Sequence, residues 1–172
     1  MKAKDIIMPA LFAALAAVLA LVTIPLPFSP VPVTGQTLAL MLAGVLLSPR
    51  HATLSMTIYI LLGAAGAPVF AGGTGGLTAL LGPAGGYLAG FIPGAAIIAF
   101  LRGNNRLPRL AAAVFCGGML AVYIPGTLWL SHVTGMGLVS AFTVGTLPYV
   151  PGDLAKLLVA TSCGVRLRHL SE

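Results

Sequence analysis

Long apolar stretches that contain almost no charged residues are the feature that most constrains this chain. Of its 172 residues, 58% are hydrophobic and 7% are charged, whereas soluble domains carry about 25% charged residues. A soluble fold could not bury that much apolar surface. Lipid accommodates such surface, and membrane helices also tolerate the glycines and prolines that occur within these stretches. The sequence therefore predicts an all-α integral membrane protein.

Six segments approach the length that a membrane-spanning helix needs. A helix crosses a hydrocarbon core of about 30 Å with about 20 apolar residues, or about 17 at the least. We predict one membrane domain, residues 1–172, folded as a six-transmembrane-helix bundle. The predicted helices are residues 5–24, 36–47, 51–65, 83–101, 108–130 and 151–165. A further apolar stretch, 136–147, is consistent with a re-entrant or surface helix.

The basic residues predict the orientation of the bundle, because short cytoplasmic loops collect Lys and Arg. The segments 25–35, 66–82 and 131–150 contain no charged residue and are therefore predicted to lie outside. Basic residues lie in every other segment along the chain: before the first predicted helix, between the second and third, between the fourth and fifth, and after the sixth. Both termini are therefore predicted to be cytoplasmic. These residues are Lys2, Lys4, Arg50, Arg102, Arg106, Arg109, Arg166 and Arg168.

Two of the predicted outer segments have compositions suited to a binding site. The first, PLPFSPVPVTGQ, holds four prolines that disfavour helix, so we expect a stiff extended lid. The second, VFAGGTGGLTALLGPAGG, is rich in glycine, which lets a backbone approach a ligand closely. A pocket wall is one interpretation of this second segment, and a flexible connector is the other.

One acidic and one basic residue remain once the residues at the termini and those used to predict the topology are set aside. Asp153 and Lys156 are three residues apart in the last helix and therefore share a face. Asp153 precedes Arg166 by about 20 Å of helix, which places the pair toward the outer side. Ionisable groups at such depth usually face the bundle interior and serve function. Alternatively, Asp153 complements the helix dipole and Lys156 extends to the interface.

Neutral hydrogen-bonding residues are predicted to surround this pair on the outer side. Together with the pair, they would suit a small, partly apolar ligand held by few polar groups. Each tyrosine could instead anchor the protein at the membrane interface, which is also our interpretation of Trp129. The neutral candidates are Thr34, Gln36, Tyr59, Thr74, Tyr87 and Tyr149.

Several other activities are disfavoured by the sequence. The net charge of +6 is spread over short segments and forms no continuous basic face for nucleic acid. There is no G-x-x-x-x-G-K-[ST] or H-E-x-x-H motif, and the histidines and the two cysteines lack metal-ligand spacing. We therefore predict no catalytic residue, no metal and no cofactor. Small residues on the first helix, Ala10, Ala13, Ala14 and Ala17, allow close helix packing, within the bundle or against another subunit.

Three stretches in order along the chain resemble one known family. They are PVPVTGQTLALMLAGVLLSPR, YILLGAAGAPVFAGGTGGLTALLGPAGGYLAGF and PGDLAK. They closely resemble the BioY family, the substrate-binding subunits of energy-coupling-factor (ECF) biotin transporters in prokaryotic membranes. The resemblance implies a plasma (inner) membrane protein that captures biotin from outside. It also implies a transmembrane coupling subunit of the EcfT type and two ABC ATPase subunits as partners.

The resemblance also suggests roles for particular residues. Asp153 would accept hydrogen bonds from the ureido N–H groups of biotin, and Lys156 would donate to the ligand or keep Asp153 ionised. Ala10 and Ala14 would meet the coupling subunit. Because some family members are thought to act alone or as homo-oligomers, a solitary carrier or channel that needs no ATPase remains an alternative. The residues expected to close over biotin are Thr34, Gln36, Gly73, Thr74 and Tyr87.

Overall fold

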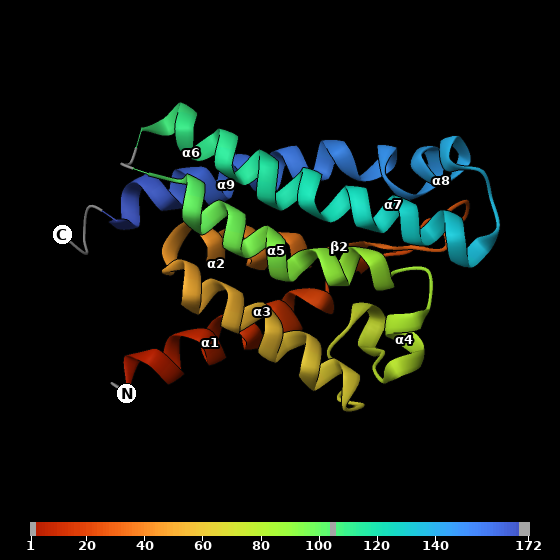
Figure 1. Ribbon diagram of the computed structural model, residues 1–172, viewed down its shortest axis with the longest axis horizontal. Helices are drawn as coiled ribbons and strands as arrows, with labels where there is room; N and C mark the ends of the chain where they lie inside the picture. The colour runs from red at the N-terminus through yellow and green to blue at the C-terminus, as the bar shows by residue number, and fades with distance from the viewer. Residues whose placement is uncertain (1–2, 104–105, 169–172) are drawn as a thin grey trace.

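A computed structural model describes residues 3–103 and 106–168 of the chain. Its longer helices run roughly along one axis and form a bundle (Figure 1). They are α1 (Lys4–Ala20), α2 (Gln36–Leu46), α3 (Pro49–Ala64), α5 (Gly85–Leu101), α6 (Leu107–Val114), α7 (Ala121–Thr134) and α9 (Val150–Arg168). A π-helical turn, η2 (Phe115–Leu120), joins α6 and α7 into one continuous rod.

The shorter elements gather at one end of the bundle (Figure 1). Two short strands pair antiparallel, with Thr23 opposite Thr34. The segment 66–82, for which a connector and a pocket wall were both considered, is folded into a 3₁₀ turn and a short helix. The stretch 136–147 likewise contains a short helix. The short elements are β1 (Thr23–Ile24), β2 (Val33–Thr34), η1 (Ala71–Gly73), α4 (Leu77–Leu81), α8 (Leu138–Gly145) and η3 (Leu147–Tyr149).

The first helix ends earlier than the sequence predicted. We expected residues 5–24, but α1 ends at Ala20 and Thr23–Ile24 form strand β1. Ile24 precedes Pro25, and a residue before proline is driven toward extended backbone angles. Pairing with β2 then satisfies the backbone of this segment. The strand pair thus holds the two ends of the proline-rich segment together, next to the start of α2.

The other helix ends follow local capping signals. α3 begins at Pro49, two residues before the predicted start, because Ser48 caps it by accepting a hydrogen bond from the His51 amide, and proline suits the first helical position. The predicted helix 108–130 extends to Thr134 and ends where Gly135 adopts a φ of 72°, a left-handed conformation that glycine adopts without strain. α5 begins two residues after the predicted residue 83, and α9 extends to Arg168.

Glycines on α5 allow the α6–α7 rod to approach it closely. A Cβ added at Gly90 would lie 2.6 Å from the backbone oxygen of Ala121, and one added at Gly94 would lie 2.5 Å from that of Gly117. Gly117 belongs to the π-helical turn, so the irregular part of the rod packs directly on α5. Small residues serve the same purpose in membrane helices generally, where close backbone approach increases dispersion contacts.

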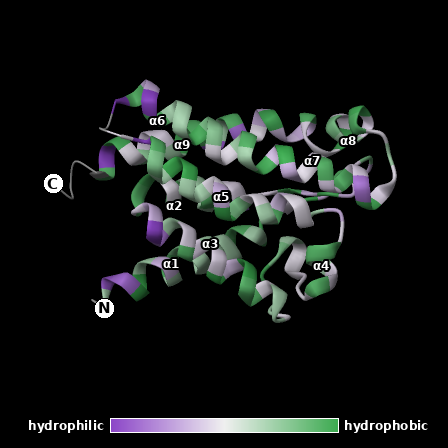
Figure 2. Cartoon of the chain, viewed as in Figure 1, coloured by the Kyte–Doolittle hydropathy of each residue, from purple (hydrophilic) through white to green (hydrophobic). Residues whose placement is uncertain are grey.

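Hydrophilic residues collect at the end of the bundle opposite the short elements (Figure 2). The start of α1, the start of α3, the start of α6 and the end of α9 all lie at this end (Figure 1). Arg50, Arg106 and Arg109 lie in these segments. Lys2 is outside the described residues. The basic segments that the sequence assigned to one side are therefore on one side in space.

One helix in the described part of the chain, Leu107–Thr134, is long and apolar enough to cross a membrane by length and composition. Gln36–Leu46 and Gly85–Leu101 are apolar but shorter. The predicted count of six spanning helices stays a prediction.

Candidate functional site

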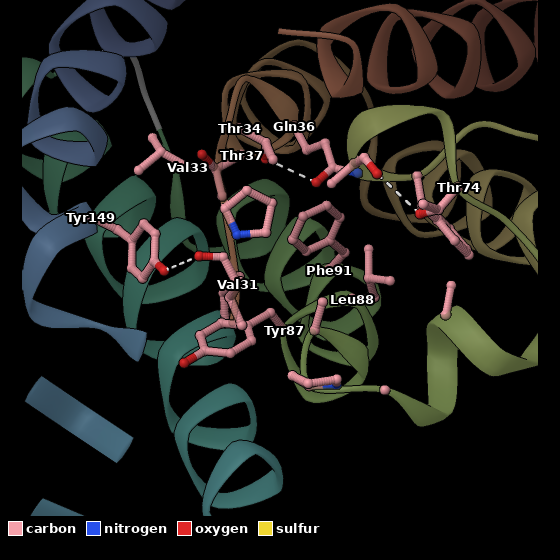
Figure 3. Close-up of a pocket in the computed structure, with 18 of the residues that line it drawn as sticks. Val31, Val33, Thr34, Gln36, Thr37, Thr74, Tyr87, Leu88, Phe91 and Tyr149 are labelled. Carbon is pink, nitrogen blue, oxygen red and sulfur yellow. Dashed lines mark hydrogen bonds between the residues drawn. The ribbon is translucent and has the colours of Figure 1, made fainter. Parts of the chain in front are cut away.

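A cavity of about 650 Å³ lies among the short elements and the adjacent ends of the long helices. Its walls combine apolar side chains with a few polar ones, as small-molecule sites usually do. In Figure 3, Thr74 and Tyr149 lie on opposite sides of this cavity, with Phe91 and Leu88 between them. The polar lining residues are Thr34, Gln36, Thr37, Thr74, Thr78, Tyr87, Tyr123, Tyr149, Asp153 and Lys156.

Asp153 is the most buried charged residue of the lining, with 2% of its surface exposed. One carboxylate oxygen, Oδ1, accepts hydrogen bonds from the Thr37 hydroxyl at 2.8 Å and from Lys156 Nζ at 2.7 Å. The other, Oδ2, accepts one from the Tyr123 hydroxyl at 2.5 Å. A buried charge needs a counter-charge and hydrogen bonds to offset its desolvation. Three donors from α2, α7 and α9 provide both.

Lys156 uses all three of its ammonium donors within the protein. Besides Asp153, Nζ donates to the Thr34 backbone oxygen at 2.6 Å and to the Thr37 hydroxyl at 2.9 Å. An ammonium group has three donors and no acceptor. The lysine therefore joins the end of strand β2 to α9 and holds Asp153 in place. Its side chain is 18% exposed.

A second series of hydrogen bonds passes the N-terminal end of α2. Thr34 Oγ1 donates to Gln36 Oε1 at 2.8 Å, Gln36 Nε2 donates to the Tyr59 hydroxyl, and Tyr59 donates to the Val69 backbone oxygen at 2.9 Å. This series links the proline-rich segment, α2, α3 and the glycine-rich segment. The two loops predicted to close the site are thus fastened to the helices beneath them.

The third outer segment is fastened to the first by Tyr149 (Figure 3). Its hydroxyl donates to the Val31 backbone oxygen and is 2.7 Å from Ser29 Oγ. Burial raises the pKa of this hydroxyl, and the hydrogen bond with Ser29 offsets part of that rise. The hydroxyl is therefore protonated, and able to donate, at neutral pH.

Seven of the nine residues predicted to bind ligand line the cavity, and two do not. Tyr59 is fully buried behind Gln36, where its ring packs against Phe70 and Phe91. Gly73 lies at the exposed tip of the turn that the Phe70–Thr74 bridge closes, so Thr74 rather than Gly73 reaches the cavity. We correct the placement of both: Tyr59 supports the wall, and Gly73 shapes the turn.

Sequence reasoning missed Thr37 and Tyr123, which contact Asp153 directly. Thr37 follows Gln36 in the first turn of α2. Because this turn directly follows the predicted lid, the Thr37 hydroxyl could have been included among the candidate ligand-binding groups. Of the chain's four tyrosines, Tyr123 is the one that was not predicted to bind ligand, because it lies well inside a predicted spanning helix. The aromatic wall formed by Phe70 and Phe91 was also missed, because apolar residues in apolar segments carry no distinguishing pattern.

The predicted docking alanines divide between two faces of α1. Ala10 and Ala14 are exposed, whereas Ala13 is buried and Ala17 is partly buried in the bundle. Ala13 is therefore excluded from an outward-facing docking stripe, and its small side chain instead lets α1 approach its own neighbours.

A helical bundle with a buried ion pair at the floor of a mostly apolar cavity defines a protein that binds a small molecule. Sequence comparison then identifies the family to which the protein belongs. The sequence model of the BioY family matches residues 1–172, and the chain belongs to that family. The resemblance seen in its three motifs is thus confirmed, and membership places the chain among membrane transport proteins.

Two curated relatives match nearly the whole chain. It is 38% identical to the biotin transporter BioY of Rhizobium etli, covering 95% of this chain and 92% of that one. It is 40% identical to the probable biotin transporter BioY of Pyrococcus horikoshii, covering 98% of both. A solved S component for biotin from an ECF-type ABC transporter superposes with a TM-score of 0.91 at 29% identity, covering 98% of this chain and 95% of that one.

Proposed function

We propose that the chain is the biotin-binding S component of an ECF-type transporter. It captures biotin from the outer side and releases it to the cytoplasm with an ATP-driven coupling module. The observation that carries the proposal is the buried Asp153 at the floor of a mostly apolar cavity, held by Thr37, Tyr123 and Lys156. The biotin transporters named above and the superposed S component support the choice of ligand.

The chemistry of biotin suits the acceptor that remains on Asp153. An ionised carboxylate has about four lone-pair sites, and three of them accept hydrogen bonds from Thr37, Lys156 and Tyr123. The remaining site is on Oδ2, and a ureido N–H of biotin would donate to it. The fused ring of the ligand would then pack on Phe91 and Tyr87, whose side chains face the cavity (Figure 3).

Lys156 acts on the ligand through Asp153 in this proposal. The sequence left open whether it donates to biotin or keeps Asp153 ionised. Because its three donors already engage Thr34, Thr37 and Asp153, we favour the second role. Tyr87 contributes its ring, since its hydroxyl is directed to the Gly145 backbone oxygen at 2.6 Å.

The proposed setting is the prokaryotic plasma (inner) membrane, with six spanning helices and both termini cytoplasmic. The collection of basic residues at the end opposite the cavity supports this orientation (Figure 2), because cytoplasmic loops collect Lys and Arg and the cavity would then open to the outer side. On the same basis, the outward face of α1 would dock the transmembrane coupling subunit. Ala10 and Ala14 lie on this face beside the exposed Ile7 and Leu11, so another helix can approach closely.

Equilibrium binding of biotin to the purified chain in detergent tests the ligand and the site together. Wild type should bind, and Asp153→Asn should weaken binding about ten- to a hundredfold, the effect of losing one charge-assisted hydrogen bond. Asp5→Asn is the matched control, because Asp5 contacts His51 at the far end of the bundle. If wild type does not bind biotin, the proposed ligand is wrong. If wild type binds biotin and Asp153→Asn binds it equally well, the proposed site is wrong.

Transport in liposomes separates the proposal from a solitary or oligomeric carrier. Uptake of biotin should require the coupling subunit, both ATPases and ATP. Ala14→Trp should abolish uptake while leaving binding intact, because a large side chain would block docking of α1. Val139→Trp is the control, since Val139 is 82% exposed on α8 at the other end of the molecule. Uptake by the chain alone would establish the carrier instead.

A further inference from the structure

The cavity has two chemically different ends. At the buried end lie Asp153 and Lys156, which are the charged residues of its lining in the described part of the chain. At the other end, Thr74 and Thr78 are exposed to solvent on the η1–α4 segment. Between the two ends the wall is apolar, with Phe91 and Leu88 facing the cavity (Figure 3). A long ligand would therefore have one end enclosed and the other near solvent.

The enclosed end suits a hydrogen-bond donor and disfavours an anion. Asp153 presents its remaining acceptor there, and a second carboxylate beside it would be repelled. Lys156 would be the partner for a ligand carboxylate, but its three donors engage Thr34, Thr37 and Asp153 at 2.6–2.9 Å. The ureido ring of biotin therefore belongs at this end, and its valerate chain extends toward the threonines.

The end of the cavity near solvent offers neutral groups to the end of the valerate chain. Thr74 already donates its hydroxyl to the Ala71 backbone oxygen at 3.0 Å. Gly75 and Ala79 complete this side with little or no side chain. A cavity of about 650 Å³ is in the middle of the range of about 300–1,000 Å³ for sites that take drug-sized ligands. The volume of the cavity and the neutral side chains at this end suit a ligand whose valerate chain ends in a neutral group as well as one that ends in a carboxylate.

We propose that this site recognises the cyclic urea and the apolar chain of its ligand but not the carboxylate. The ligand class would then include biotin whose carboxyl group is blocked as an ester or an amide, such as biotin joined to the side-chain amine of lysine. The inference rests on the proposed function, because it takes biotin as the parent ligand. It adds an activity: binding of carboxyl-blocked biotin.

Competition binding on the purified wild-type chain tests this. Biotin, biotin methyl ester and biotinyl-lysine are compared, with N1′-methylbiotin, in which one ureido N–H is replaced by N–CH₃, as the control. The ester and the lysine amide should bind within about tenfold of biotin, and N1′-methylbiotin should bind more weakly. A loss of more than about tenfold for both blocked compounds is the size expected for a lost charge-assisted contact, and it would overturn the inference. If biotin itself does not bind, the proposed function has failed and the inference falls with it.

The Lys156→Met variant gives a second, independent measurement. If Lys156 acts through Asp153, the variant should weaken biotin and its methyl ester by the same factor. If Lys156 instead binds the carboxylate, the variant should weaken biotin by about tenfold or more and leave the ester unchanged. That second result would overturn the inference. Should this variant not fold, the comparison of ligands on wild type decides alone.

Discussion

At the scale of single residues, the site is organised around a carboxylate that three side chains hold in one orientation. Thr37, Tyr123 and Lys156 come from α2, α7 and α9, so the position of Asp153 depends on how those helices pack. A buried charge tolerates few alternative arrangements, because each would leave it without a hydrogen bond. The acceptor left on Oδ2 is therefore fixed in direction before a ligand arrives.

Tyr123→Phe tests this organisation. Removing the hydroxyl takes away the hydrogen bond to Oδ2 at 2.5 Å and leaves the ring in place. Affinity for biotin should fall about tenfold, as expected for one hydrogen bond to a charged group. Tyr87→Phe is the comparison, because that hydroxyl donates to the Gly145 backbone instead. Tyr87→Phe should lower the melting temperature and leave the affinity for biotin nearly unchanged. An equal loss of affinity in Tyr123→Phe and Tyr87→Phe would contradict the central role of Asp153.

Part of this arrangement was predictable from the sequence, and part was not. Asp153 and Lys156 were identified because charged residues within an apolar helix are exceptional and their spacing places them on one face. Thr37 and Tyr123 were not, because which way a helix turns its side chains is decided by packing against helices far away in the sequence. In α5 and α7 that packing follows from glycine contacts, whose pairing no single sequence reveals.

At the scale of elements, the outer segments are fastened together as a lid rather than left as loops. Thr23 Oγ1 accepts from the Gly72 amide at 3.2 Å, joining the strand pair to the glycine-rich turn. Tyr149 joins η3 to the proline-rich segment through Val31 and Ser29. The prolines predicted a stiff lid from sequence, but these contacts between distant segments could not be predicted, since they depend on the fold.

Tyr149→Phe should loosen this lid. Losing a hydrogen bond whose net contribution is about 1 kcal/mol should increase the dissociation rate of biotin by about fivefold. Because burial raises the pKa of the Tyr149 hydroxyl, the contact stays protonated, and the wild-type rate should not change between neutral and mildly alkaline pH on its account. Stopped-flow displacement measures both. Thr143→Ala removes an α8 hydroxyl that bonds only to its own helix and serves as control; equal rates in the two variants would argue against the lid.

The close packing of α5 on the α6–α7 rod makes a separate prediction about stability. Gly90→Ala would place a Cβ 2.6 Å from the Ala121 backbone oxygen, which cannot move without shifting the helix. Overpacking of this kind costs about 1–3 kcal/mol, so thermal unfolding in detergent should occur several degrees lower. Gly152→Ala is the matched control, because it lies in helix α9 with open space around it. There, alanine should be neutral or slightly stabilising.

At the scale of the whole molecule, the direction of transport follows from which end of the bundle faces outside. The sequence predicted this from the basic residues of its termini and loops, and the segments that carry the described ones lie at the end away from the cavity (Figure 2). Lys156, which lines the cavity, was not among those residues. The number of spanning helices stays a prediction, because α2 has 11 residues and α5 has 17, below or at the usual limit for crossing a bilayer.

Cysteine labelling on either side of the α6–α7 rod tests that orientation. The rod, Leu107–Thr134, has 28 residues and a length of about 42 Å, enough to cross a bilayer once. Arg106 is exposed at its beginning, and Gly137 lies beyond its end with open space around it. In a background with Cys116 and Cys163 replaced by alanine, an impermeant maleimide should label Gly137→Cys in intact cells and Arg106→Cys only after permeabilisation. The reverse pattern would invert the protein and place the cavity inside; labelling of both in intact cells would mean that the rod does not cross the membrane.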